Sequence, residues 1–219
     1  MRRIQWVLLA FLVVAVGAGV SWGAPIKSLT PVLSGPTEDF EGFAEGTMLD
    51  TQVPGVTFSQ APLGGRPMID NSPMLYGYSA SSGVGVVTGS TEGGYTYPTV
   101  AGIVTTFGTP QSAVQAYLGD YAPLGDYVVA AYDSTNTLLE SLTVYQAELN
   151  STTPGWYVGF TRGSADITSV QFGPSNYYTW GDAFCIDDLT FSGSIIPLPG
   201  TASMLAVGLV GLMLGGRRR

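Results

Sequence analysis

Two short acidic motifs contain the side chains of this sequence best suited to chemistry. Glu38-Asp39-Phe40-Glu41 begins the central part of the chain, and Ile186-Asp187-Asp188-Leu189 ends it. A carboxylate among apolar neighbours needs a partner, and Ca²⁺ prefers such oxygen ligands. We therefore predict that Glu41, Asp187 and Asp188 hold a structural Ca²⁺. Hydrogen bonds to loop amides, or simple exposure to solvent, are the alternatives.

The two motifs can meet only if distant segments of the chain lie side by side. The first and last strands of a β-sandwich often do, which would bring Glu41 or Asp39 near Asp187 or Asp188. A regular strand alternates its side chains between two faces. The second motif would then place Asp188 on one face with Ile186 and Thr190, and Asp187 on the other with Leu189 and Phe191.

Aromatic residues are the second candidate for chemistry. Tyr177-Tyr178-Thr179-Trp180-Gly181-Asp182 combines flat rings with a carboxylate in a segment that reads as a loop. Exposed rings can stack on sugars, and a carboxylate can accept hydrogen bonds from sugar hydroxyls. We predict a polysaccharide-binding patch formed by Tyr177, Tyr178, Trp180 and Asp182. The alternative for any single ring is ordinary packing.

Residue usage excludes several classes of enzyme. The chain has no histidine and one cysteine, Cys185, which argues against most zinc enzymes and Ser-His-Asp hydrolases. Cys185 lies in an apolar run and is expected to be buried. A reactive thiol or an intermolecular bridge is the alternative. The acidic pair could also serve glycoside hydrolysis, but the sequence does not fix the separation that this reaction needs.

Charge is distributed unevenly along the chain. All sixteen acidic residues lie between residues 24 and 194, where the basic residues are Lys27, Arg66 and Arg162, so this part carries a net charge of −13. Such a surface disfavours nucleic acid and anionic lipid. It is compatible with divalent cations and neutral glycans.

Residues 24–194 contain short apolar runs separated by glycine and proline, a pattern that predicts strands rather than helices. We expect an all-β fold, an antiparallel β-sandwich resembling a jelly roll. Asp133–Thr137 is expected to be a hairpin loop. The expected strands are Val56–Ser59, Met74–Tyr78, Gly83–Thr88, Ile103–Phe107, Ala113–Leu118, Tyr127–Tyr132, Leu138–Val144, Trp156–Thr161, Ile167–Phe172 and Phe184–Phe191.

Both ends of the chain are typical of targeting segments. Residues 1–23 combine two arginines, an apolar run and small residues, as in a secretory signal peptide, with cleavage expected after Gly23. Residues 195–219 contain a proline hinge, a short apolar run and three terminal arginines, which predicts a membrane-inserted helix with its arginines on the cytoplasmic side. Residues 24–194 are expected to form one exported domain. Ala24 to Gly35 is expected to be a lead, and Ser192 to Gly200 a linker.

The tail resembles the PEP-CTERM sorting signal, which has a Pro-Glu-Pro-like motif, an apolar helix and an arginine cluster. The matching residues are Pro197, Pro199, Gly200, Arg217, Arg218 and Arg219, whereas Leu198 stands where that motif usually has glutamate. The resemblance implies processing by an exosortase-type enzyme. Phe40-Glu41 and Ile186-Asp187-Asp188-Leu189 resemble the first and last strands of jelly-roll carbohydrate-binding modules, which implies calcium between them.

These features together predict an exported, non-enzymatic protein, anchored in the membrane transiently or stably and then placed at the cell surface or in the extracellular matrix. We expect it to bind polysaccharide. The alternatives are a structural coat protein without a ligand and, less favoured, a polysaccharide-active enzyme.

Overall fold

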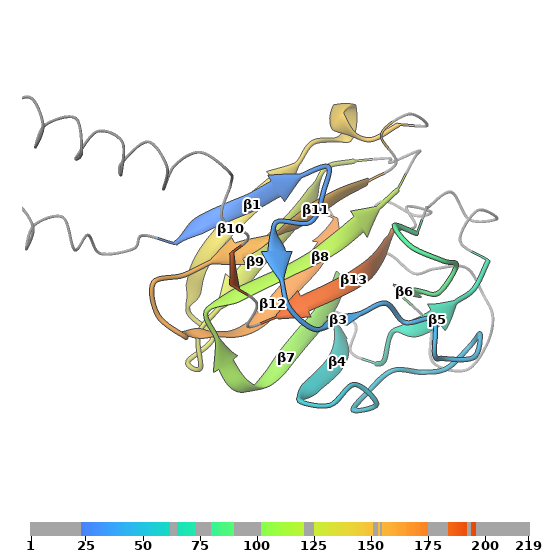
Figure 1. The fold of residues 1–219 in the computed structure, drawn as a ribbon, viewed down its shortest axis with the longest axis horizontal. Helices are drawn as coiled ribbons and strands as arrows, with labels where there is room; N and C mark the ends of the chain where they lie inside the picture. Colours follow the sequence, from blue (N-terminus) through green and yellow to red (C-terminus); the bar gives the residue numbers. More distant parts are fainter. Residues whose placement is uncertain are drawn as a thin grey trace, which may run out of the picture.

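The described residues form two antiparallel sheets in a β-sandwich (Figure 1). The computed structural model describes residues 23–61, 65–72, 80–89, 102–120, 125–150, 153, 155–174, 184–191 and 194–195. None of these residues belongs to a helix that could cross a membrane. The predicted signal peptide and sorting helix lie outside the described residues.

The first sheet has seven strands, in the order β1-β11-β8-β13-β6-β5, with β3 beside β13. Its strands are β1 (Ala24–Ser28), β3 (Thr37–Glu38), β5 (Met68–Asp70), β6 (Val86–Thr88), β8 (Ala113–Gly119), β11 (Gly155–Thr161) and β13 (Cys185–Phe191). β3 pairs with β13 through Glu38 and Leu189. The prediction that the first and last strands lie side by side is therefore confirmed for the strands that carry the two acidic motifs.

The second sheet has five strands, in the order β10-β9-β12-β7-β4. Its strands are β4 (Val56–Ala61), β7 (Gly102–Gln111), β9 (Tyr127–Tyr132), β10 (Leu138–Val144) and β12 (Ile167–Pro174). A separate short pair joins β2 (Leu33–Ser34) to β14 (Ser194–Ile195). One short 3-10 turn, η2 (Gln146–Glu148), lies between β10 and β11.

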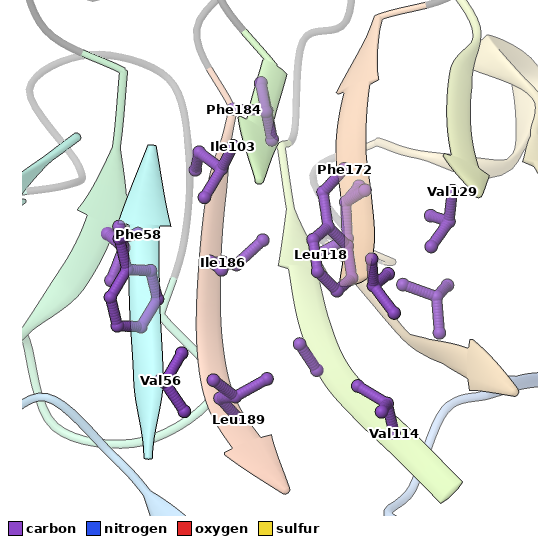
Figure 2. Close-up of a cluster of buried hydrophobic side chains, with 14 of the residues drawn as sticks. Val56, Phe58, Ile103, Val114, Leu118, Val129, Phe172, Phe184, Ile186 and Leu189 are labelled. Atoms are coloured by element: carbon purple, nitrogen blue, oxygen red, sulfur yellow. The ribbon is translucent and has the colours of Figure 1, made fainter. Parts of the chain in front are cut away.

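The hydrophobic core fills the space between the two sheets. Alternate residues of the strands point into it, such as Leu118 of β8 and Phe172 of β12, which are both fully buried. Figure 2 shows Phe58 and Ile103 of the five-stranded sheet in the same cluster as Ile186 and Leu189 of β13. Burying side chains of this size contributes about 2 kcal/mol each, so the core is the main source of stability.

The prediction of an all-β antiparallel fold is confirmed. Tyr127–Tyr132 and Leu138–Val144 coincide with β9 and β10, and most other expected strands differ from the observed ones by a few residues. The expected strand Gly83–Thr88 is shorter, because only Val86–Thr88 is extended in the sheet. The expected strand Met74–Tyr78 lies outside the described residues. The sequence analysis missed β5, which has three residues and no alternating pattern.

The segment expected to be an N-terminal lead is part of the fold, which corrects that prediction. Ala24–Ser28 is strand β1, whose Ile26 is buried against Leu33 and Ala113. Lys27 forms an ion pair with Glu148 and also lies 5.6 Å from the centre of the Trp156 ring. The expected linker also contributes Ser194–Ile195 as β14. Short strands such as these give a weak periodic signal, which is why the sequence pattern did not reveal them.

The hairpin predicted at Asp133–Thr137 is confirmed. Oδ1 of Asp133 accepts hydrogen bonds from the amides of Thr135 and Thr137, at 2.8 and 2.9 Å. Asn136 adopts a left-handed conformation, with φ of 60°, which asparagine tolerates better than most residues. The side chains of the loop thus determine the turn that joins β9 to β10.

The register of the strands defines two ends of the sandwich. Cys185, at the start of β13, pairs with Gly119 at the end of β8 and with Thr88 at the end of β6. The connections β4–β5, β6–β7, β8–β9, β10–β11 and β12–β13 all leave from this end, which we call the loop end. At the opposite end, which we call the terminal end, Ala24 pairs with Thr161.

The described chain both enters and leaves the sandwich at the terminal end (Figure 1). β13 finishes there, because Phe191 pairs with Val114 near the start of β8. Ile195 then pairs with Leu33, which packs on Ala113 at the same end. The described residues next to the two predicted targeting segments, Gly23 and Ile195, are therefore at one end of the domain, and the strand ends that lead into the five connections are at the other.

Candidate functional site

The second acidic motif lies on an irregular strand. The register between β13 and β8 shifts between Asp187 and Thr190, and Asp188 has a φ of 48°. Ile186 and Leu189 both belong to the core. The expected regular alternation, with Asp188 on the face of Ile186 and Asp187 on the face of Leu189, is therefore wrong. The bulge inserts an extra residue and lets both carboxylates bond to the same segment outside the core.

Asp187 is fully buried and holds a loop through hydrogen bonds. Its Oδ2 accepts bonds from the amides of Ser81 and Ser82, at 2.9 and 3.1 Å, and from the Ser81 hydroxyl at 3.0 Å. Its Oδ1 accepts a bond from the Asp188 amide at 2.7 Å. Both oxygens of this buried carboxylate are thus satisfied by neutral donors.

Asp188 binds the same loop through hydroxyl groups. Its Oδ2 accepts hydrogen bonds from the Ser81 hydroxyl at 2.5 Å and from the Tyr157 hydroxyl at 2.8 Å. Its Oδ1 accepts a bond from the Ser82 hydroxyl at 3.0 Å. Tyr157 comes from β11, on the far side of β8 from β13, so this carboxylate connects the loop to two strands of the sheet.

Glu41, from the first acidic motif, holds the other half of the loop. Its Oε1 accepts hydrogen bonds from the amides of Val84 and Gly85, at 2.7 and 2.6 Å. The preceding residue, Phe40, is buried in the core with a φ of 59°. The two acidic motifs therefore converge on one segment, Ser81–Gly85. We call the set formed by Glu41, Asp187 and Asp188 the acidic clasp.

Two glycines allow the close approach of the clasp to this segment. A Cβ on Gly83 would lie 2.2 Å from the Glu41 carboxylate, and the residue has a φ of 43°. A Cβ on Gly85 would lie 2.8 Å from the Phe40 carbonyl oxygen. Only a residue without a side chain fits these positions without movement of its neighbours.

Burial alters the acidity of Asp187 and of its neighbour Tyr157. It raises the pKa of Asp187 to about 6, mainly because the charged carboxylate loses solvation, with a smaller contribution from neighbouring Asp188. It also raises the pKa of Tyr157 to about 12. Because the folded-state pKa of Asp187 exceeds its unfolded value, this group stabilises the fold most below about pH 4. That contribution declines as the pH rises through about 6.

The oxygens of the acidic clasp face hydrogen-bond donors of the chain itself. No group of three or more His, Cys, Asp or Glu side chains among the described residues is arranged to hold a metal ion. Glu41 Oε1 and Asp187 Oδ2 face amide N–H groups, which repel a cation and cannot rotate away as hydroxyls can. The carboxylates therefore fit hydrogen-bond donors better than calcium. Calcium binding stays a prediction from the sequence.

The predicted burial of Cys185 is confirmed. Its side chain is fully buried, and its Sγ lies 3.5 Å from the Gly119 carbonyl oxygen, to which it can donate. Loss of solvation, together with the nearby carboxylates of Asp187, Asp120 and Asp70, raises the pKa of the thiol well above its usual value. A protonated and enclosed thiol is a poor nucleophile.

The other predicted site residues lie outside the described residues. They are the aromatic patch Tyr177, Tyr178, Trp180 and Asp182, and the sorting residues Pro197, Pro199, Gly200 and Arg217 to Arg219. The sequence analysis missed Ser81, Ser82 and Tyr157 as partners of the clasp. The Ser-Ser-Gly-Val-Gly run, with two glycines and two hydroxyls, was the available signal. This run indicated a loop that donates hydrogen bonds, but it did not indicate which residues accept them.

Comparison with known proteins gives only a distant likeness. No protein-family model matches the chain, and no curated protein matches its sequence. Among solved structures it resembles the K2 cleaved adhesin domain of Lys-gingipain, with 20% identity, a TM-score of 0.47, and coverage of 72% of this chain and 97% of that domain. The K3 domain of the same protein from Porphyromonas gingivalis w83 gives 15% identity, a TM-score of 0.35, and coverage of 69% and 100%. Neither function nor ligand follows from likenesses at this level.

The Gly83→Ala variant tests the close packing of the clasp. We expect it to lower the free energy of unfolding by about 1–3 kcal/mol, because the new Cβ would meet the Glu41 carboxylate in an unfavourable backbone conformation. Gly42→Ala is the matched control, since a Cβ there meets nothing within 4 Å. Urea denaturation measures both. Equal stability of the two variants would contradict the described contact.

Melting temperatures measured with and without EDTA distinguish a clasp held by hydrogen bonds from the predicted calcium site. If amide and hydroxyl donors satisfy the carboxylates, EDTA should leave the melting temperature unchanged. Asp188→Ala should lower it in buffer with and without EDTA alike, because the hydroxyls of Ser82 and Tyr157 lose this acceptor. A fall in melting temperature with EDTA that Asp188→Ala abolishes would instead support the calcium prediction.

Proposed function

We propose that this chain is an exported, non-enzymatic β-sandwich protein that is sorted to the cell envelope or extracellular matrix and makes contacts through the loop end of its domain. The observation that carries this proposal is the separation of the two ends. Ala24 and Ile195 lie at the terminal end, whereas the strand ends that lead into five connections lie at the loop end. A domain held at its terminal end would present those connections outward.

The targeting segments of the sequence supply the tether in this proposal. Residues 1–23 would direct export, and residues 195–219 would enter the membrane and be processed by an exosortase-type enzyme. Both segments join the domain at its terminal end, so neither joins it at the loop end. The membrane anchor would be transient or stable, depending on whether that enzyme cuts the tail.

The chemistry of the described residues supports a non-enzymatic role. The carboxylates of the acidic clasp bind amides and hydroxyls of the chain itself, and the single thiol is enclosed and protonated. The sequence contains no histidine to act as a base. Carboxylates and thiols catalyse reactions in many enzymes, but in this domain the clasp carboxylates hold a loop and the thiol is buried.

A neutral polysaccharide is the contact that the composition favours. Tyr177, Tyr178, Trp180 and Asp182 follow β12 and precede β13 in the sequence, and the strand ends on either side of them, Pro174 and Cys185, are at the loop end. Rings can stack on sugar faces, and a body with a net charge of −13 repels anionic polymers but not neutral ones. We propose these four residues as the ligand contacts.

Removal of the three terminal arginines tests the tether. We expect deletion of Arg217–Arg219 to move the chain out of the membrane fraction or to change its processing, because the positive charges retain the tail on the cytoplasmic side. Fractionation and immunoblotting in a host with an exosortase-type enzyme measure this. Replacing all three arginines by lysine keeps the charge and is the matched control. Identical fractionation of the deleted and intact chains would refute the proposed anchor.

Pull-down with neutral polysaccharides tests the contact. We expect Tyr178→Ala and Trp180→Ala each to weaken binding by about tenfold, the loss of one stacking contact. Leu138→Ala is the control, because this apolar side chain is exposed and begins β10, at the opposite end of the strand from the loop end. Absence of binding to any polysaccharide would favour a structural coat protein instead. Release of sugars by the purified chain would favour the enzyme alternative.

A further inference from the structure

Glu140, near the terminal end, has a carboxylate oxygen that accepts no hydrogen bond from the described part of the chain. Its Oε2 is buried, and among the described residues no donor forms a hydrogen bond with it. The nearest cation is Arg162, whose Nη1 lies 3.9 Å away. Arg162 instead directs Nε and Nη2 to Asp166, at 3.0 and 2.8 Å. A buried carboxylate oxygen in this position is costly unless another donor reaches it.

The start of strand β1 lies directly beside this oxygen. A Cβ placed on Gly23 would be 3.3 Å from Oε2 of Glu140 and 2.6 Å from the Thr161 carbonyl oxygen. The next residue, Ala24, pairs with Thr161 in the sheet. The peptide bond between Gly23 and Ala24 is also the bond at which the sequence predicts signal-peptide cleavage.

We infer that Glu140, together with the Thr161 carbonyl, is a binding site for the new α-ammonium group that export creates on Ala24. Cleavage adds water across the Gly23–Ala24 amide, so the departing peptide gains a carboxylate and Ala24 gains an ammonium. The ammonium carries three donors and a full charge, whereas the amide that it replaces has one donor. This inference rests on the proposed export of the chain.

The site has a functional consequence. Before cleavage the Glu140 oxygen accepts no hydrogen bond from the residues that the structure describes and has only the long 3.9 Å ion pair with Arg162, and after cleavage it would gain a second cation that can donate to it. Processing would therefore tighten the attachment of β1, which is an edge strand of the seven-stranded sheet. The mature domain would become more stable than its precursor at the moment it is released from the signal peptide.

The pairing predicts a defined dependence on pH. An α-ammonium group has an unperturbed pKa of about 7.7–8.0, and a carboxylate neighbour raises it in the folded state. The stabilisation is then fully present below about pH 7.7 and is lost as the pH rises through the folded-state pKa. The other charged groups at the site are Arg162 and Asp166. Their mutual hydrogen bond raises the pKa of Arg162 and lowers that of Asp166, away from this range.

The test uses the full exported chain, purified in mild detergent after mass spectrometry has established its N-terminus. At pH 6.5 we expect Glu140→Gln to lower the melting temperature by about 3 °C. At pH 10 the difference from the unmodified chain should become smaller, because only the long ion pair with Arg162 remains to be lost. Selective acetylation of the α-amine of the wild-type chain should also lower the melting temperature at pH 6.5. Glu45→Gln, at an exposed acidic position, is the matched control and should change neither value.

The outcomes distinguish this inference from the proposed export. A chain that still begins at Met1 would overturn both. A chain that begins at Ala24, but loses the same stability through Glu140→Gln at pH 6.5 and pH 10, would overturn the pairing alone. If Glu140→Gln fails to fold, the comparison of acetylated and free wild-type chain decides, and equal melting temperatures at pH 6.5 would refute the ammonium site.

Discussion

The need to satisfy buried carboxylates without cations organises one face of this molecule. The part of the chain between residues 24 and 194 contains sixteen acidic and three basic residues, so most carboxylates cannot find an ion-pair partner. Asp187 is fully buried and relies on two amides and a hydroxyl of the Ser81–Gly85 segment. The same segment donates to Asp188 and Glu41. One loop thus donates hydrogen bonds from neutral groups to three carboxylates. The bulge in β13 places two of those carboxylates, Asp187 and Asp188, within reach of the loop.

The sequence predicted the fold class and most strands of this protein because their patterns are local. Tyr127–Tyr132 is an apolar run, Leu138–Val144 combines apolar and polar residues, and a polar turn separates them; the structure has both strands at those residues. The pairing of the acidic motifs also followed from a general property of sandwiches. By contrast, β5 and β2 depend on pairing with distant segments. No short window of sequence contains that information.

The sequence predicted only part of the candidate site, because its remaining residues come from a segment distant in the chain. The sequence indicated that Glu41, Asp187 and Asp188 need partners, but not that a serine loop supplies them. The bulge at Asp187–Asp188 was not predictable either, because it has no glycine and interrupts a run that reads as a regular strand. A position whose conformation is imposed by tertiary contacts gives little local signal.

The reliance of the acidic clasp on neutral donors affects how the protein should respond to ionic strength. Salt screens attraction between exposed opposite charges, but a buried carboxylate that accepts amide hydrogen bonds has little such attraction to lose. The excess of like charge on the body is screened at the same time, which relieves self-repulsion. Rising salt should therefore leave the clasp intact and favour the compact state.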